Sequence, residues 1–390
     1  MARPFISMQP TRWRGRHAYL MSNGLLDVVE LTGGGHIADV RFRPETGYPT
    51  NNVLWESPWK SIDPARFRLR DEATYGPSFV GKFLCGFTGH ALCLDFFGAP
   101  SPEEIAQGLA LHGEAPVSEW KIRAGRNGLQ ASVDLPHARL GFTRRIETLP
   151  GESVLYFNET VQNRKTTDHY FSWVQHATFG PPLMSPNESS FFVNGARAKS
   201  WALGYEGNAI LRDDAEFRWP HAPALGKRTV DLRKAFATDG KGFVATIRVD
   251  EKSKLGTIAV LNWKLGLAAG YIFRSSDFPW VTLWEENIAR LGAPWNGEAR
   301  ARGVEFGTTP FPIGTTETIL SGPLFNTPTL ARVGARSALS TAYAMFVTPV
   351  PLDWREISKI EASDDTIILR GKNKNQKLKV SASKLQMILT

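Results

Sequence analysis

Cysteine is scarce in this chain, and long apolar runs are absent. Only Cys85 and Cys93 occur among 390 residues, so a disulfide framework is not expected, which suits a reducing compartment. No stretch of about 18 consecutive apolar residues is present, and the first residues lack the apolar core of a signal peptide. The sequence therefore predicts a cytoplasmic protein with no membrane partner.

Motifs of several large enzyme classes are also missing. The chain has no Gly-x-Ser-x-Gly elbow, no His-Glu-x-x-His pair and no P-loop. The run Gly33-Gly34-Gly35-His36 is too short for a dinucleotide fingerprint. We interpret it as the turn of a hairpin between residues 28–31 and 37–40. We therefore expect no cofactor and no bound metal.

Helical periodicity is rare, and strand patterns dominate. Alternation or strand propensity predicts strands at residues 155–163, 242–250, 256–263 and 315–320. Short helices are predicted at 102–108, where Ser101 is the N-cap, and at 329–343. Glycine (35) and proline (25) are spread along the chain as turn residues. This pattern predicts an all-β protein, a large antiparallel β-sandwich with a few short helices.

The composition shifts only near residue 350. Residues 1–350 are predicted to form the sandwich, and residues 351–390 a hairpin-like extension packed on the same domain, with strands at 366–370 and 378–381. The net charge is +8, and part of the excess lies in residues 372–379. A basic patch can bind nucleic acid, but no helix-turn-helix or zinc-finger spacing accompanies it. We interpret it as a solvated hairpin tip and expect no nucleic-acid partner.

Two strand-like runs each end at one titratable residue. His176 follows an apolar run and precedes Gly180-Pro181-Pro182, which ends the strand. Glu305 lies between Val304 and Phe306, where a carboxylate must be paired or have a raised pKa. If folding brings the two together, they form an acid–base pair. A core histidine and a salt bridge to an arginine are the structural alternatives.

Further candidates for a site are one histidine and the tryptophans. His112 follows an apolar run and precedes Gly113, which permits close backbone approach. The chain has 12 tryptophans, and flat aromatic faces stack on sugar rings. Trp55 and Trp284 lie in candidate loops of a carbohydrate cleft, and core packing is the alternative for each.

Six short segments, by their order and spacing, resemble the aldose 1-epimerase (galactose mutarotase-like) superfamily, and most closely its bacterial branch of aldose epimerase-type proteins. They are residues 33–37, 52–55, 111–114, 159–163, 175–180 and 303–307. The resemblance runs from about Asn23 to Thr348. It implies a twisted supersandwich fold and an isomerase of carbohydrate metabolism that interconverts sugar anomers. We expect a small-molecule sugar as partner, and a monomer or homodimer.

The resemblance also implies roles for individual residues. His112 would bind the sugar, His176 would be the general acid and Glu305 the general base. Trp284 or Trp55 would form an apolar wall. The arginine that this superfamily carries in an early substrate loop has no clear match, and Lys82 is a weak substitute for it.

The chain departs from the pattern of the superfamily in two further places. Ala177 and Thr178 intervene before Phe179, where many relatives have proline and an aromatic residue directly after the histidine. The substrate-binding aspartate has four candidates, namely Asp213, Asp214, Asp231 and Asp239.

The sequence is also compatible with other functions. The chain could be a non-catalytic carbohydrate-binding or sensor protein on the same fold. It could be a polysaccharide lyase that uses Tyr170 or Tyr205, or a glycoside hydrolase in which Glu286 or Glu114 is the second carboxylate. A purely structural protein that interacts through its basic tail is the third alternative.

Overall fold

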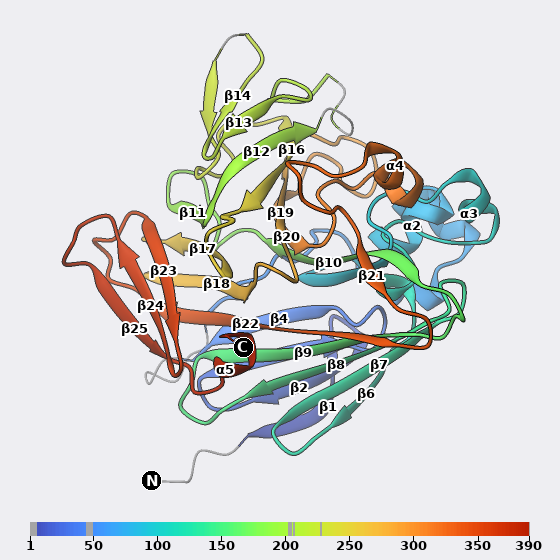
Figure 1. Cartoon of the computed structure of the whole chain (residues 1–390), viewed down its shortest axis with the longest axis horizontal. Helices are drawn as coiled ribbons and strands as arrows, with labels where there is room; N and C mark the ends of the chain where they lie inside the picture. The colour runs from blue at the N-terminus through green and yellow to red at the C-terminus, as the bar shows by residue number, and fades with distance from the viewer. Residues whose placement is uncertain (1–5, 44–49, 202–204, 206, 227, 390) are drawn as a thin grey trace.

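Two large antiparallel sheets dominate the computed structural model (Figure 1), which describes residues 6–43, 50–201, 205, 207–226 and 228–389. In this part of the chain the first sheet has 14 strands, in the order β1-β2-β3-β4-β5-β10-β20-β19-β16-β12-β13-β14-β15, with β21 paired to β10. The second sheet has eight strands, in the order β11-β17-β18-β22-β9-β8-β7-β6. The predicted β-sandwich is confirmed.

The strands of the first sheet are β1 (Ser7–Trp13), β2 (Arg16–Ser22), β3 (Leu26–Leu31), β4 (Ile37–Phe42), β5 (His90–Asp95), β10 (His169–Phe179), β12 (Gly195–Trp201), β13 (Glu216–Arg218), β14 (His221–Pro223), β15 (Thr229–Asp231), β16 (Lys241–Val249), β19 (Trp280–Asn287), β20 (Arg300–Gly307) and β21 (Ala331–Val333). Those of the second are β6 (Lys121–Ala124), β7 (Gly128–Leu135), β8 (Leu140–Thr148), β9 (Val154–Asn163), β11 (Ser189–Val193), β17 (Leu255–Asn262), β18 (Leu267–Arg274) and β22 (Ala338–Pro349).

Helices are short and lie in the connections. They are α1 (Glu72–Tyr75), α2 (Ser78–Leu84), α3 (Pro102–Ala106), α4 (Gly314–Ser321), α5 (Gln386–Leu389) and the 3₁₀ turns η1 (Pro64–Arg66), η2 (Leu69–Asp71) and η3 (Ala115–Val117). The predicted helix after Ser101 is confirmed as α3, and Ser101 Oγ accepts a hydrogen bond from the Glu104 amide. No helix among the described residues is long and apolar enough to cross a membrane.

Alternation along the strands separates the core from a second, smaller apolar cluster. On β16, Phe243, Ala245 and Ile247 join the main core. Val244 points to the opposite face and joins a cluster of aromatic residues there. The central strands of the first sheet are therefore covered on both faces, by the second sheet and by the aromatic cluster.

Two predicted elements are wrong. Residues 315–320 form helix α4 rather than a strand, and Ile319 and Leu320 are exposed. The buried residues of α4 are Gly314 and Thr318, four positions apart, which is a helical spacing, so the apparent alternation did not indicate a strand. Residues 329–343 contain β21 and the start of β22 rather than a helix. Ala338 and Ser340 at the start of β22 are exposed, and the strand is buried on both faces only from Thr341 onward, where Tyr343 and Ala344 join different apolar clusters.

A third sheet follows the sandwich. Strands β23 (Ile357–Ser363), β24 (Thr366–Gly371) and β25 (Lys377–Ser381) form it, and Figure 1 shows it beside β17 and β18. The sequence predicted a two-stranded hairpin, and β23 is the strand that it missed. Ile360, Ile367 and Leu369 pack on the second sheet in a separate apolar cluster. The division at residue 350 stays a prediction.

Candidate active site

Neighbouring strands of the first sheet bring His176 and Glu305 into contact. His176 on β10 is the direct register partner of Glu305 on β20. The flanking residues Val304 and Phe306 belong to the main core, so Glu305 points to the opposite face, toward the aromatic cluster. His176 Nε2 lies 3.3 Å from Glu305 Oε1, and the two residues are only 4% and 2% exposed.

Burial controls the charge of this pair. Loss of solvation lowers the pKa of His176 to about 4 and raises the pKa of Glu305 well above its usual range. Both groups therefore favour their uncharged forms, and the pair holds one proton near neutral pH. A neighbouring carboxylate ordinarily raises the pKa of a histidine, but here desolvation dominates and the pKa of His176 falls.

The third predicted residue, His112, lies beside this pair. The ring centroids of His112 and His176 are 5.3 Å apart. The Gly98 amide donates to His112 Nδ1 at 3.1 Å, and burial lowers the pKa of His112. A neutral ring that accepts at Nδ1 carries its proton on Nε2, so His112 is a hydrogen-bond donor to any ligand it meets.

Gly113 holds His112 in place. It has φ +88°, and a Cβ added there would lie 2.2 Å from the Leu94 carbonyl oxygen. Gly113 bridges Leu94 on β5, the strand next to β10. Only glycine allows this approach, which fixes the turn against the strand beside His176.

A cavity of about 250 Å³ opens onto the three residues. Its described lining residues are Phe83, Leu84, Phe87, Gly98, Ala99, Leu111, His112, His176, Trp201, Val244, Trp284, Arg290, Trp295, Glu305 and Pro312. Phe87 packs edge-on against His176 at 5.1 Å between ring centroids, and Trp284 lies at 6.2 Å. Apolar walls and a few convergent polar groups are typical of a small-molecule site.

The structure brings only some of the predicted binding residues to this cavity. Trp284 lines it. Trp55 does not; it stacks on Trp295 with 6.4 Å between centroids and supports that wall from behind. Lys82 Nζ donates instead to the Gly108 carbonyl oxygen at 3.3 Å, on the exposed side of α2. This placement gives no support to Lys82 as a substrate ligand.

Other candidates from the sequence also lie outside the lining of the cavity. Glu114 accepts from the amides of residues 137 and 138, and Glu286 accepts from those of residues 289 and 290. Tyr170 is 55% exposed, and the Tyr205 hydroxyl donates to Glu286. The four candidate aspartates are not among the described lining residues either.

Arg290 lines the cavity and was missed by the sequence reasoning. Its guanidinium lies 4.6 Å from the ring centroid of Tyr205, 5.0 Å from Trp295 and 5.6 Å from Trp284. Its Nη1 is 3.4 Å from Glu286 Oε2, so its charge is paired. The one signal in the sequence was an arginine between two tryptophans, which becomes meaningful only after folding stacks them.

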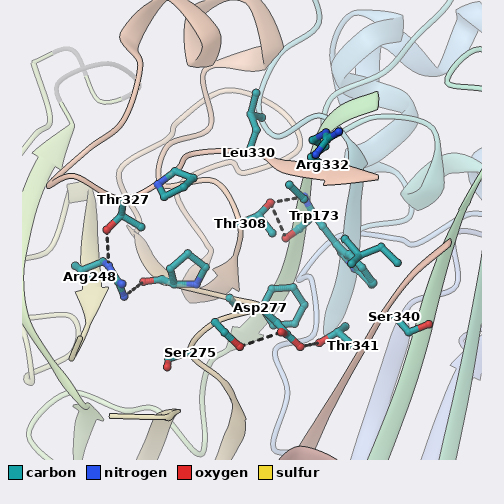
Figure 2. A pocket seen from close by; sticks show the side chains of 16 residues that line it. Trp173, Arg248, Ser275, Asp277, Thr308, Thr327, Leu330, Arg332, Ser340 and Thr341 are labelled. Atoms are coloured by element: carbon teal, nitrogen blue, oxygen red, sulfur yellow. Dashed lines mark hydrogen bonds between the residues drawn. The ribbon is translucent and has the colours of Figure 1, made fainter. Parts of the chain in front are cut away.

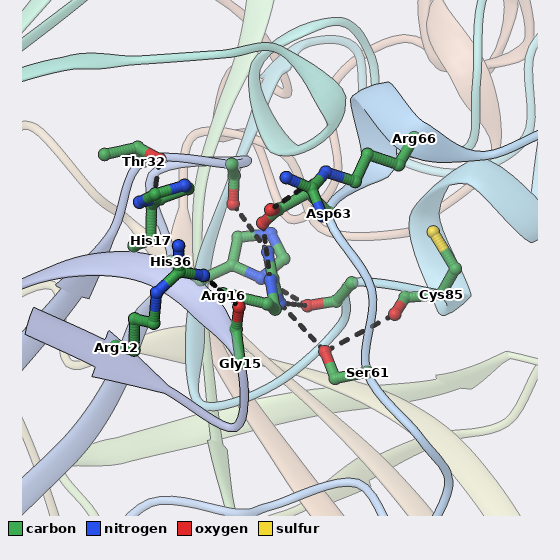
Figure 3. A network of polar contacts seen from close by, with 12 residues as sticks. Arg12, Gly15, Arg16, His17, Thr32, His36, Ser61, Asp63, Arg66 and Cys85 are labelled. Atoms are coloured by element: carbon green, nitrogen blue, oxygen red, sulfur yellow. Dashed lines mark hydrogen bonds and ion pairs between the residues drawn. The ribbon is translucent and has the colours of Figure 1, made fainter.

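A buried arginine anchors the loop that carries Phe87 (Figure 3). Arg16 donates to Asp63, to Ser61 and to the carbonyl oxygen of Gly86, the residue before Phe87. His36 Nδ1 contacts the same Gly86 oxygen at 2.9 Å. The β1–β2 hairpin is thereby tied to one wall of the cavity.

A larger cavity of about 370 Å³ lies elsewhere (Figure 2). Its charged groups already have partners. Asp277 accepts from Thr341 and Arg274, and Arg248 donates to Thr327. None of the predicted site residues is among its described lining residues. Volume alone therefore does not mark it as the active site.

Comparisons with known proteins identify the fold of the chain through solved structures alone. No family model matches the chain, and no curated protein matches it in sequence. Solved structures do match. A candidate aldose 1-epimerase from Klebsiella pneumoniae superimposes with a TM-score of 0.59 at 15% identity, over 88% of this chain and 83% of that one.

Two further solved structures align with the same region. A galactose mutarotase-like protein from Clostridium acetobutylicum gives a TM-score of 0.56 at 10% identity, over 88% of this chain and 99% of that one. A candidate aldose 1-epimerase from Escherichia coli K12 gives 0.55 at 12% identity, over 88% and 100%.

Proposed function

Since the chain has the galactose mutarotase-like fold, we propose that it is a sugar epimerase of the aldose 1-epimerase type. The observation that carries this proposal is the contact between His176 and Glu305 at an aromatic-walled cavity. The proposed reaction needs neither a metal nor a cofactor, because it only moves protons. Its substrate would be a cyclic hemiacetal.

Interconversion of anomers requires one proton acceptor and one proton donor. The hydroxyl on the anomeric carbon must lose its proton, and the ring oxygen must gain one. A pair that holds a single proton supplies both functions. Transfer of that proton across the 3.3 Å contact interconverts the uncharged pair and the ion pair of Glu305 and His176.

In the ion-paired form the roles follow directly. Glu305 removes the proton from the anomeric hydroxyl, and His176 protonates the ring oxygen. The open-chain aldehyde rotates about its C1–C2 bond, and ring closure reverses the two transfers. His112 donates from Nε2 to a sugar oxygen, and Trp284 packs against the C–H face of the ring.

The same geometry argues against a hydrolase. Glycoside hydrolysis requires two carboxyl groups roughly 5–10 Å apart at the scissile bond. Glu305 is the one carboxylate among the described residues that line the cavity. A non-catalytic sugar-binding protein would use the same cavity, and only a rate measurement separates it from an epimerase.

Exchange NMR between the α and β anomers of a panel of aldoses tests the proposal. We expect the protein to accelerate exchange, and Glu305→Gln to reduce that acceleration by at least about a hundredfold without unfolding. Glu114→Gln, which changes a carboxylate outside the cavity, is the matched control. A binding protein would shift sugar resonances without faster exchange, and full activity of Glu305→Gln would overturn the assignment.

A further inference from the structure

The cavity is rich in hydrogen-bond donors and poor in acceptors. Four of its described lining residues carry charged or imidazole side chains, namely His112, His176, Arg290 and Glu305. His112 offers a proton from Nε2 because Nδ1 is occupied by the Gly98 amide, and an arginine can only donate. Glu305 is the one carboxylate acceptor in this set, and it already contacts His176.

The other described lining side chains are aliphatic or aromatic, and their only polar hydrogen-bonding atoms are the indole N–H groups of three tryptophans, which also donate. Each hydroxyl of a sugar is both a donor and an acceptor. Among the described lining side chains a hydroxyl proton finds few acceptors, and a hydroxyl that leaves water without one binds more weakly.

The charge of the cavity is balanced as well. Arg290 is paired with Glu286, and the pair of His176 and Glu305 favours its uncharged form. An anionic substituent such as a phosphate or carboxylate would therefore find no unpaired cation among the described lining residues. The cavity of about 250 Å³ is below the roughly 300–1,000 Å³ of drug-sized pockets, which fits a single sugar ring.

From this imbalance we propose that the substrate is an uncharged, hydroxyl-poor monosaccharide, a deoxy sugar rather than a fully hydroxylated hexose. This inference rests on the proposed epimerase function. The anomeric hydroxyl meets Glu305, the ring oxygen meets His176, and the remaining oxygens accept from His112 and Arg290. The deoxygenated positions face the aromatic and aliphatic wall that includes Val244 and Trp284.

A matched series of hemiacetals tests the substrate class. Anomer exchange is measured by NMR for glucose, 6-deoxyglucose and 2,6-dideoxyglucose, and each rate is divided by the spontaneous rate of that sugar. We expect kcat/KM to rise along the series, by at least about tenfold from first to last, since an apolar wall discriminates against an added hydroxyl by up to about a hundredfold.

The outcomes separate the two proposals. Equal or faster exchange of glucose would overturn the hydroxyl-poor substrate while leaving the epimerase function intact. No acceleration of any of the sugars would overturn both.

A variant tests the physical cause of the preference. Val244→Thr places a hydroxyl in the wall with almost no change of shape, and should shift the preference several-fold toward glucose. Val230→Thr, on β15 outside the cavity, is the control and should leave the ratio unchanged. An unchanged ratio in Val244→Thr would contradict the assignment of the preference to missing acceptors.

Discussion

At the scale of single residues, burial sets the chemistry of the site. The sequence singled out His112, His176 and Glu305 from their positions beside strand ends, glycine and proline, and from a resemblance in motif order to a superfamily, and the structure brings the three together. It could not predict their charge, which depends on the walls formed by Phe87 and Trp284. It missed Arg290 because Trp284, Trp295 and the distant Tyr205 come together around its guanidinium only after folding.

The first prediction concerns the pH dependence of catalysis. An ordinary histidine titrates near pH 6.5, whereas burial lowers the pKa of His176 to about 4 and raises that of Glu305. The pair keeps its single proton between these limits. We therefore expect kcat/KM to stay level through pH 6.5, where an ordinary histidine titrates, as measured by anomer exchange. An inflection near pH 6.5 that vanishes in His176→Asn would show that this histidine is not desolvated.

At the scale of elements, the sequence predicted β9, β16 and β17 from local strand propensity, although β16 and β17 are buried almost throughout. It failed at α4, whose apolar residues are exposed, and at β22, which is buried on both faces from Thr341 onward. In both segments the environment that decides the structure comes from other parts of the chain. The register that pairs β10 with β20 could not be predicted either, because 129 residues (305 − 176) separate the register partners His176 and Glu305.

The second prediction concerns the turn that holds His112. Gly113→Ala should lower the free energy of unfolding by more than about 1 kcal/mol and weaken sugar binding, because the new Cβ meets the Leu94 carbonyl oxygen. Gly108→Ala is the matched control, with a similar φ of +84° but open space around the Cβ position. Urea unfolding compares the two, and equal losses would show that the close approach at Gly113 is unimportant.

The third prediction concerns the anchor of the β1–β2 hairpin. Arg16→Met leaves the buried Asp63 with only the exposed Arg66, 4.0 Å away, as an ion-pair partner, and removes a donor from the Gly86 carbonyl oxygen. We expect a loss of about 3–5 kcal/mol in the free energy of unfolding. Arg12→Met, on the same hairpin but exposed, should change stability by less than about 0.5 kcal/mol. Similar losses from both variants in denaturant titrations would contradict the anchoring role.

At the scale of the whole molecule, four buried histidines are distributed through the fold. Burial lowers the pKa of His36 to about 3, that of His176 to about 4, and those of His90 and His112 well below the usual value. The sequence showed eight histidines but not which of them the layers would enclose. Because four histidines are buried, the free energy of unfolding of the whole protein depends on pH in the acid range.

The fourth prediction follows from that count. Below about pH 6.5 the unfolded chain binds protons at these histidines and the folded chain does not, so stability falls as pH falls. Each histidine contributes about 1.4 kcal/mol per pH unit until its folded pKa is reached. Glu30, whose pKa burial raises to about 7, and Glu305 act in the opposite direction above about pH 4.5.

The steepest loss of stability is therefore expected below about pH 4.5, where those two carboxyl groups are protonated in both states. Guanidinium titrations between about pH 3.5 and 6.5 measure it. A free energy of unfolding that stays constant over this range would contradict the buried, neutral histidines.

The central claim is that His176 and Glu305 act as one catalytic unit, and a double-mutant cycle on the anomer-exchange rate tests it most directly. Residues that act as a unit give strongly non-additive losses. We predict that Glu305→Gln and His176→Asn each reduce the catalysed rate by at least about a hundredfold, and that the double variant is hardly slower than the worse single one. Full activity in either single variant, or losses that simply multiply, would contradict the account.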